Sequence, residues 1–235
     1  DLAKRAERAY RFELGLSDSS FIQFGYWDNL KKGLLAGEQL GFALKRMDAA
    51  YLDQNKRDFE ITRHISLMFH DPLELIVLKV TGKCNFKLPE SFFDADYPGH
   101  YMRRTKSVGL TIPCVVGPYT SVNCTLMLLS NRARITSTPA EPYHNEPDDL
   151  ADDRFNFNFA AQQSIATSHA QSDSGVFELN FRDERYLPFE GAGAISEWQI
   201  ELPATTNAFD FSTISDVVLH LKYTARDGGE ILRAA

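Results

Sequence analysis

The chain has 235 residues, enough for one large domain or two small ones, and it can bury a sizeable hydrophobic core. Its content of 43% hydrophobic and 24% charged residues is ordinary for a globular protein. The net charge of -7 argues against nucleic acid as the main partner, because a phosphate backbone is bound by a basic face. No apolar run approaches the ~18 residues of a membrane span, and no signal peptide is visible. Residue 1 is an aspartate inside a helical pattern, so we expect the sequence to be a piece of a longer chain.

The first 71 residues have helical periodicity. Apolar residues recur on one stripe of the opening segment, namely Leu2, Ala6, Ala9 and Phe12. Gly15 and the polar run 17–20 interrupt this pattern, and a second helical pattern extends from about Phe21 to Leu67. Pro72 follows Asp71, a pair that commonly stops a helix. We therefore predict a helical hairpin over residues 1–71.

Three glycines recur every four residues in the longer arm of this hairpin, at Gly33, Gly37 and Gly41. Five nearby charged residues exclude a membrane helix here: Lys31, Lys32, Glu38, Lys45 and Arg46. Each glycine inside a helix costs up to ~1 kcal/mol relative to alanine. The stripe therefore predicts a tight packing face for another backbone, either of this chain or of a neighbouring protomer.

After residue 71 the period becomes two, which is typical of strands. Six segments show it, at residues 73–80, 101–112, 121–130, 176–181, 194–202 and 216–223. No helical pattern long enough for a parallel crossover separates them, so residues 72–235 are expected to form an antiparallel β-sandwich, jelly-roll-like in type. Residues 132–163 are rich in Pro, Asp and Glu and predict an irregular excursion. The expected fold class is α+β.

The residues that could bind a metal are scattered. Three cysteines, Cys84, Cys114 and Cys124, have no zinc-type spacing and are expected as buried thiols. His64 and His70 are the histidines nearest to each other in sequence, but their separation of six does not align them on a helix, and we favour structural or surface roles for all six histidines. The acidic cluster at 148–153 lacks the order of a calcium loop. We predict no metal site and no cofactor.

A charged stretch at 181–195, FRDERYLPFEGAGAI, has the composition of a catalytic or phosphate-binding loop. However, a phosphate-binding loop opens a helix, whereas Gly191-Ala192-Gly193 is followed by a strand pattern, and Glu190 would repel a phosphate. No nucleophile motif is present elsewhere. We therefore predict that the chain is not an enzyme and that the glycines shape a turn. A hydrolase would require Asp183 and Glu190 to share one pocket.

Three long motifs carry a resemblance to a known family. They are GHYMRRTKSVGLTIPCVVGPYTSVNCTL at 99–126, SIATSHAQSDSGVFELNFRDERYLPFEGAGAISEWQIELP at 164–203 and FDFSTISDVVLHLKYTARDGG at 209–229. Together with the helical segments at 7–14, 26–40 and 47–67, they resemble the C-terminal part of the TcA subunit of bacterial Tc (ABC-type) insecticidal toxin complexes. The similarity covers nearly the whole chain except residues 132–163.

This resemblance implies a docking function. TcA subunits are secreted homopentamers around a translocation channel, and their C-terminal TcB-binding domain docks the TcB–TcC cocoon so that the toxic enzyme enters the channel. The implied partners are TcB–TcC and other TcA protomers, with no membrane insertion by this segment.

Exposed charges near turns are the candidate contacts to TcB: Arg103, Arg104, Lys106, Arg182, Asp183, Glu184, Arg185 and Glu190. The competing interpretation for each is an ion pair within the domain. A second hypothesis is a carbohydrate-binding β-sandwich in which Tyr119, Tyr186 or Trp198 stacks on sugar, although Trp198 alternates with polar neighbours as a core residue does.

Overall fold

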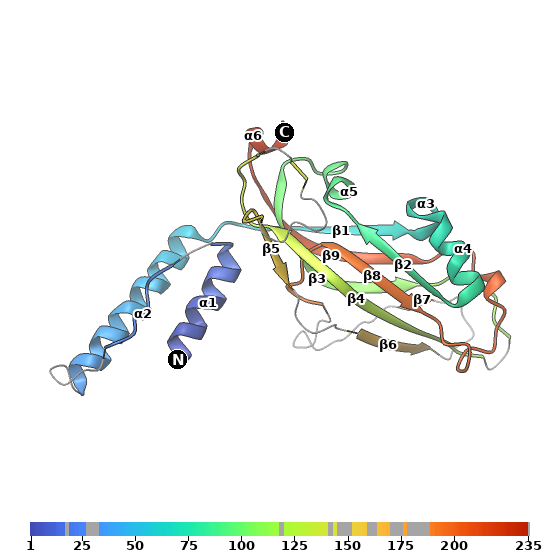
Figure 1. Cartoon of the computed structure of the whole chain (residues 1–235), viewed down its shortest axis with the longest axis horizontal. Coiled ribbons are helices and arrows are strands. Elements are labelled where there is room, and N and C mark those ends of the chain that lie inside the picture. Colours follow the sequence, from blue (N-terminus) through green and yellow to red (C-terminus); the bar gives the residue numbers. More distant parts are fainter. Residues whose placement is uncertain are drawn as a thin grey trace. The chain divides into compact units, whose positions relative to one another are not determined.

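The computed structural model describes residues 1–16, 19–26, 33–117, 120–140, 143–144, 152–158, 164–169, 176–177 and 189–234 (Figure 1). The chain divides into two compact units, Asp1–Arg57 and Asp58–Ala235. The division lies before residue 71 because the segment that follows Arg57 pairs with strands of the second unit. Among the described helices, none combines the length and the apolar character that crossing a bilayer requires.

The first unit contains two helices, α1 (Leu2–Leu14) and α2 (Leu34–Gln54). Helix α1 ends at Gly15, which adopts a left-handed conformation with φ of 70° and donates its amide to the Phe12 carbonyl. Tyr10 and Leu14 of α1 pack with Met47 of α2 in a small buried cluster. The predicted helical hairpin is therefore present, with a shorter second arm than expected.

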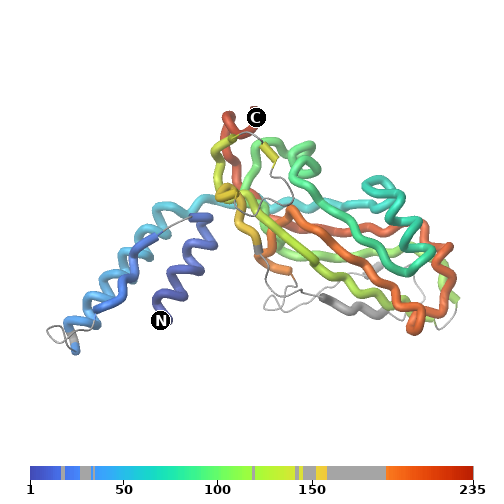
Figure 2. The backbone as a smooth tube through the Cα atoms, in the orientation of Figure 1, coloured from blue at the N-terminus to red at the C-terminus, as the bar shows by residue number. Residues whose placement is uncertain are grey.

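Residues 59–66 were expected to continue the second helix, and this expectation is wrong. They form strand β1 (Phe59–Ser66), which pairs antiparallel with β9 (Val218–Asp227) over its whole length. Figure 2 shows these two segments side by side although they lie far apart in the sequence. Pairing with β9 satisfies the backbone hydrogen-bonding groups of this charged segment. Local propensity alone does not decide between a helix and a strand here.

Residues 73–80 were expected to form a strand, and this expectation is also wrong. They lie in helix α4 (Pro72–Thr81), which follows the short helix α3 (Leu67–His70). The capping residues explain the outcome: Asp71 accepts a hydrogen bond from the Glu74 amide, Pro72 occupies the first turn, and Gly82 ends the helix with φ of 74°.

Two antiparallel sheets make up the second unit. The first has the order β1-β9-β3-β7, with β3 at His100–Thr111 and β7 at Val176–Phe177. The second has the order β2-β8-β4-β5, with β6 also paired to β4, and its strands are β2 (Lys83–Leu88), β8 (Ile195–Glu201), β4 (Val122–Arg134), β5 (Phe155–Asn158) and β6 (Ser164–His169). The short elements are helices α5 (Glu90–Asp94) and α6 (Glu230–Arg233) and the 3-10 turn η2 (Phe211–Thr213).

The core lies between the two sheets. Trp198 and Ile200 of β8 and Leu221 and Tyr223 of β9 are at most 1% exposed and belong to one buried cluster. Leu78 of α4 joins the same cluster and is fully buried. This arrangement confirms the predicted α+β class with an antiparallel sandwich.

Two described parts of the predicted excursion at 132–163 are regular. Its start completes β4, and Phe155–Asn158 forms β5, which pairs with Asn131–Arg134. Phe155 is buried at 5% exposure beside the guanidinium of Arg134, so an aromatic anchor fixes this part of the segment.

Candidate docking surface

Helices α3 and α4 expose a continuous series of apolar side chains. We call these six residues the apolar ridge: Met68, Phe69, Leu73, Ile76, Val77 and Val80. Their exposed fractions lie between 41% for Val77 and 87% for Phe69. The four members on α4 have the spacing i, i+3, i+4 and i+7, so they share one helix face.

The opposite face of α4 is apolar too. Leu75 and Leu78 point into the sandwich core at 5% and 0% exposure. A helix that is apolar on both sides is normally buried on both sides. Since one side of α4 is covered by the chain and the other is open, the ridge has the character of a surface for a partner.

The ridge is comparable in area to the largest apolar patch on a typical monomer. Six large apolar side chains, each 41–87% exposed, present an area on the order of several hundred Å², and the largest patch on a typical monomer is ~300–600 Å². A specific interface takes about 800 Å² from each partner. The ridge can therefore supply a substantial part of one interface.

Polar contacts hold the two helices against the sandwich. Asp216 accepts a hydrogen bond from the Met68 amide at 2.9 Å, and Glu74 accepts one from the Asn85 amide at 3.0 Å. The ring of His70 is bonded to the Lys87 carbonyl at 2.7 Å. A surface fixed in this way loses little conformational entropy on binding.

Residue pattern alone missed the ridge because 73–80 was assigned to a strand. The signal that could have found it is the helix start at Asp71-Pro72 together with Gly82, which turns the apolar run into a stripe with helical spacing.

The charged candidates divide into buried and accessible residues. Arg103 and Arg104 were expected to be exposed, but they are 2% and 8% exposed. Both are drawn into ion pairs, Arg103 with Asp94 at 2.6 Å and Arg104 with Asp58 at 3.6 Å, so neither offers an open cation to a partner.

Lys106 and Glu190 remain at the surface. Lys106 forms an exposed ion pair with Glu60 at 2.6 Å, and Glu190 is exposed in a turn. The other four candidates lie outside the described residues: Arg182, Asp183, Glu184 and Arg185. Because Asp183 is among them, the pocket that a hydrolase would need Asp183 and Glu190 to share lies outside the described residues as well.

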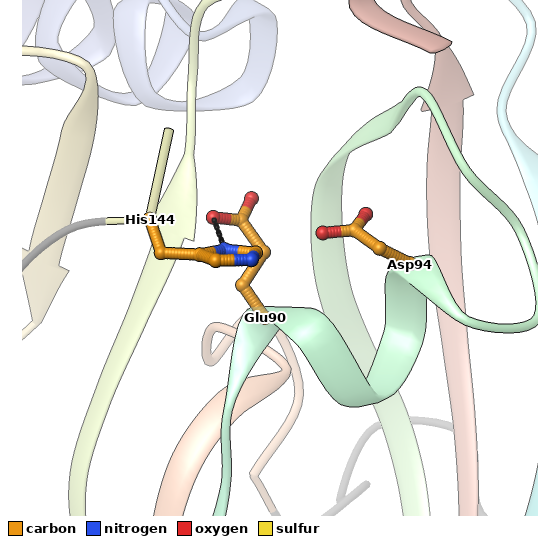
Figure 3. A group of neighbouring side chains, drawn as sticks. All are labelled: Glu90, Asp94 and His144. Carbon is orange, nitrogen blue, oxygen red and sulfur yellow. Dashed lines mark ion pairs between the residues drawn. The ribbon is translucent and has the colours of Figure 1, made fainter. Parts of the chain in front are cut away.

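Glu90, Asp94 and His144 form a group that has the donor types of a metal site (Figure 3). Glu90 is 3% exposed and accepts hydrogen bonds from both Nε and Nη2 of Arg134, at 2.7 and 2.8 Å. Asp94 accepts a hydrogen bond from Nη2 of Arg103, and Nδ1 of His144 lies 3.6 Å from Oε2 of Glu90.

Two buried arginines therefore already balance the two carboxylates of this group. A divalent cation would have to displace the bidentate Arg134 from Glu90 and leave that guanidinium buried without its partner, which is strongly unfavourable. The arrangement fits an ionic network that joins α5 to β3 of one sheet and β4 of the other.

The Gly191-Ala192-Gly193 segment is a packing element between the two sheets. The Gly191 amide donates to the Thr105 carbonyl at 2.9 Å, and the Gly193 amide donates to Oδ1 of Asn131 at 2.8 Å. A Cβ placed at Gly193 would lie 2.0 Å from the Arg132 carbonyl oxygen, so no other residue fits. Backbone contacts occupy this segment, which is incompatible with a phosphate cradle.

Gly33, at the N-cap of α2, and Gly37 and Gly41 inside that helix have the opposite environment. A Cβ added at Gly33, Gly37 or Gly41 would meet nothing within 4 Å in the described chain. Among the described residues, no other backbone of this chain approaches these three glycines. The neighbouring side chains Leu35 and Phe42 are 59% and 67% exposed.

Of the three aromatic residues in the carbohydrate hypothesis, Trp198 is not available as a sugar platform. Trp198 is fully buried, packs edge-on against Phe189 and donates its indole N–H to Oγ of Ser196, so it cannot stack on a ligand. Tyr119 and Tyr186 lie outside the described residues.

Comparison with known proteins gives consistent results. A family model described as the Tc toxin complex TcA C-terminal TcB-binding domain matches residues 1–225. The chain is 39% identical over 234 residues to "Toxin subunit YenA2" of Yersinia entomophaga, covering 97% of this chain and 17% of that protein.

Two solved structures share the fold. The cryo-EM structure of Morganella morganii TcdA4 matches with a TM-score of 0.63 and 24% identity, over 95% of this chain and 10% of that chain. The cryo-EM structure of Yersinia pseudotuberculosis TcaA-TcaB matches with a TM-score of 0.61 and 22% identity, over 96% of this chain and 13% of that chain. The chain thus spans a small part of each relative, and it belongs to the family of Tc toxin TcA C-terminal TcB-binding domains.

Proposed function

We propose that the chain is a non-enzymatic docking module that binds TcB, and with it the TcB–TcC cocoon, at the entrance of a TcA translocation channel. The observation that carries this proposal is the apolar ridge on a member of the TcB-binding family. The module performs no chemistry in this account. It fixes the cocoon in place so that the enzyme inside can enter the channel.

The ridge is the proposed contact to TcB. Burying apolar surface contributes roughly 25 cal/mol per Å², so covering several hundred Å² gives a substantial part of a docking energy. The adjoining strand β2 is an edge strand whose exposed face carries Lys83 and Lys87. Lysines on an edge discourage the addition of another strand. The chemistry therefore favours docking onto the helical face rather than pairing with the sheet edge.

Charged residues have a secondary role in this proposal. Lys106 and Glu190 are accessible, and Arg182, Asp183, Glu184 and Arg185 remain candidates from the sequence. Charges at the rim of an interface change the rate and selectivity of association more than its final affinity. Arg103 and Arg104 are assigned to the internal ion pairs instead.

We propose further that the parent protein is a secreted homopentamer and that α2 packs against a neighbouring protomer there. Gly37 and Gly41 leave open space beside α2, and Leu35 and Phe42 expose apolar surface on the same helix. Small residues next to exposed apolar ones allow the close approach of a second backbone. The isolated chain should dock TcB without perforating membranes.

The direct experiment is to mix the purified chain with purified TcB–TcC and to measure complex formation by size-exclusion chromatography and calorimetry. A pentameric TcA that contains this module serves as the positive control. We expect both to bind. If neither binds, the docking function is wrong, and binding by the pentamer alone would show that this module is insufficient for docking.

A further inference from the structure

Two histidines that are distant in sequence meet on the outer face of the first sheet. His64 of β1 and His220 of β9 are directly opposite in the antiparallel register. Their Nδ1 atoms lie 2.6 Å apart, and their ring centroids are 4.8 Å apart at an interplanar angle of 76°. His64 is exposed and His220 is half-buried.

We propose that His64 and His220 form a binding site for a late first-row transition-metal cation of the Zn²⁺ class. Imidazole nitrogen is a preferred ligand for these cations, and the two Nδ1 atoms, 2.6 Å apart, are close enough to bind one ion together. With Zn–N bonds of ~2.0–2.1 Å and tetrahedral angles, two ligand nitrogens stand roughly 3.3 Å apart. The observed pair would need to open by less than 1 Å, which exposed side chains achieve by small rotations, and water would complete the coordination.

The surroundings of His220 suit a metal ligand. Nε2 of His220 lies 2.7 Å from Oγ1 of Thr111 on the neighbouring strand β3. When Nε2 donates its proton to this hydroxyl, Nδ1 carries the lone pair that a metal needs. A hydrogen bond to the second ring nitrogen is the usual way in which proteins fix the tautomer and orientation of a ligating histidine.

The histidine pair is accessible from solvent, because His64 is exposed. His220 pairs in register with Gly109 of β3, which has no side chain to cover the site. The nearest charged residue on this face of β9 is Lys222, which is paired in register with Thr62 and not with His64. Without a metal, a hydrogen bond between the two rings accounts for the short separation of their Nδ1 atoms.

Such a site would link an edge strand to its neighbour. Strand β1 stands at the end of the sheet order and is the first strand of the sandwich after the helical unit. A cation bound by both histidines would cross-link β1 to β9 and stabilise the pairing of these two strands. The reason is that any ligand that binds only the folded state raises the stability of that state. The site does not depend on the docking function proposed above.

The test uses the full chain without a histidine tag and measures Zn²⁺ and Cu²⁺ binding by calorimetry, together with the melting temperature. We expect one bound cation per chain and a rise in melting temperature. His64→Ala and His220→Ala should each abolish the rise and weaken binding by at least the roughly 10–100-fold that loss of a hydrogen-bond partner of a ligand costs. His64→Gln provides a second variant of similar size that retains a polar group.

His144→Ala is the matched control, because His144 belongs to the other candidate group with Glu90 and Asp94. It should leave both binding and the thermal shift unchanged. The inference is overturned if wild-type binding equals that of the double variant His64→Ala/His220→Ala, or if His144→Ala alone removes binding.

Discussion

Arg134 donates two parallel hydrogen bonds to Glu90, of 2.7 and 2.8 Å, and both side chains are almost completely buried. The guanidinium also lies over the rings of Tyr143 and Phe155, at 4.4 and 4.7 Å. Since Arg134 belongs to β4 and Glu90 to α5, this pair fixes α5 onto the second sheet. The resemblance-bearing motif at 99–126 contributes Arg103 to the same network.

Removing one partner of this pair should be strongly destabilising. Glu90→Gln leaves the Arg134 charge buried without its carboxylate, so we expect a loss of about 3–5 kcal/mol in the free energy of unfolding. Urea denaturation followed by circular dichroism measures this loss. Glu60→Gln, which breaks the exposed pair with Lys106, is the matched control and should cost at most about 1 kcal/mol. Equal effects of the two variants would contradict the structural role of Glu90.

Two glycines should respond to alanine in opposite directions. At Gly193 the new Cβ would lie 2.0 Å from a backbone oxygen, so Gly193→Ala should lower the free energy of unfolding by on the order of 3 kcal/mol or more. At Gly41 the space is open and the residue is inside α2, so Gly41→Ala should stabilise the isolated chain by up to ~1 kcal/mol. Urea denaturation of both variants provides the comparison. A stabilising Gly193→Ala would show that Gly193 does not lie this close to the backbone of Arg132.

The α2 glycines have a separate test in an assembled parent. Gly37→Leu should fill the open face of α2 and disturb the packing of neighbouring protomers, while leaving the fold of the isolated chain intact. Native mass spectrometry of the pentamer measures assembly directly. Normal assembly of the variant would exclude a packing role for this stripe.

Much of the sandwich could be predicted from the sequence, because β4, β8 and β9 alternate apolar and polar residues when one face is buried. Strand β1 was missed since Ile65 is its only buried residue and its charged residues resemble a solvated helix. Helix α4 was missed because an uninterrupted apolar run has no decisive period, and only its capping residues identify it.

The site was less predictable than the fold. The burial of Arg103 and Arg104 depends on carboxylates that other elements bring to them, Asp94 from α5 and Asp58 from the start of the second unit. Likewise, His64 and His220 are 156 residues apart and meet only through the pairing of β1 with β9. Charge and residue type reveal candidates, but long-range pairing decides which of them are available.

The three thiols should differ in reactivity. Burial raises the pKa of Cys84 and of Cys124 to about 12, and it also raises the pKa of Cys114, which is only half-buried. At pH 8 a thiol with a pKa near 12 is ionised in only about one molecule in ten thousand. Titration with a disulfide reagent should therefore label Cys114 first, and all three thiols after denaturation. Rapid labelling of Cys84 or Cys124 in the native state would contradict the core packing.

Stability should fall at alkaline pH, partly through Tyr223. Burial raises the pKa of Tyr223 from 10.0 to about 12, and its hydroxyl has no hydrogen-bond partner among the described residues. Between pH 10 and 12 the unfolded chain releases this proton before the folded chain does, so unfolding is favoured by on the order of 2–3 kcal/mol at the upper end. Tyr223→Phe should leave stability at pH 8 nearly unchanged or improve it, and it should reduce the decline above pH 10.

The comparison that isolates Tyr223 is the difference between wild type and Tyr223→Phe at each pH, since Cys84 and Cys124 titrate in the same range in both proteins. Urea denaturation at pH 8 and pH 11 provides the four values. An identical decline in the two proteins would show that the Tyr223 hydroxyl ionises as readily in the folded state as in the unfolded one.

The most direct test of the docking account is the affinity of TcB–TcC for matched charge variants of two exposed isoleucines. Ile76→Asp places a carboxylate in the apolar ridge, and Ile231→Asp places one on α6, outside the ridge, where the wild-type side chain is 74% exposed. Both variants should fold normally, because substitutions of exposed side chains usually change stability by less than about 0.5 kcal/mol. We predict that Ile76→Asp weakens TcB–TcC binding by at least roughly tenfold, as loss of a central apolar contact does, and that Ile231→Asp binds like wild type. Wild-type affinity of Ile76→Asp would contradict the central claim that the apolar ridge docks TcB.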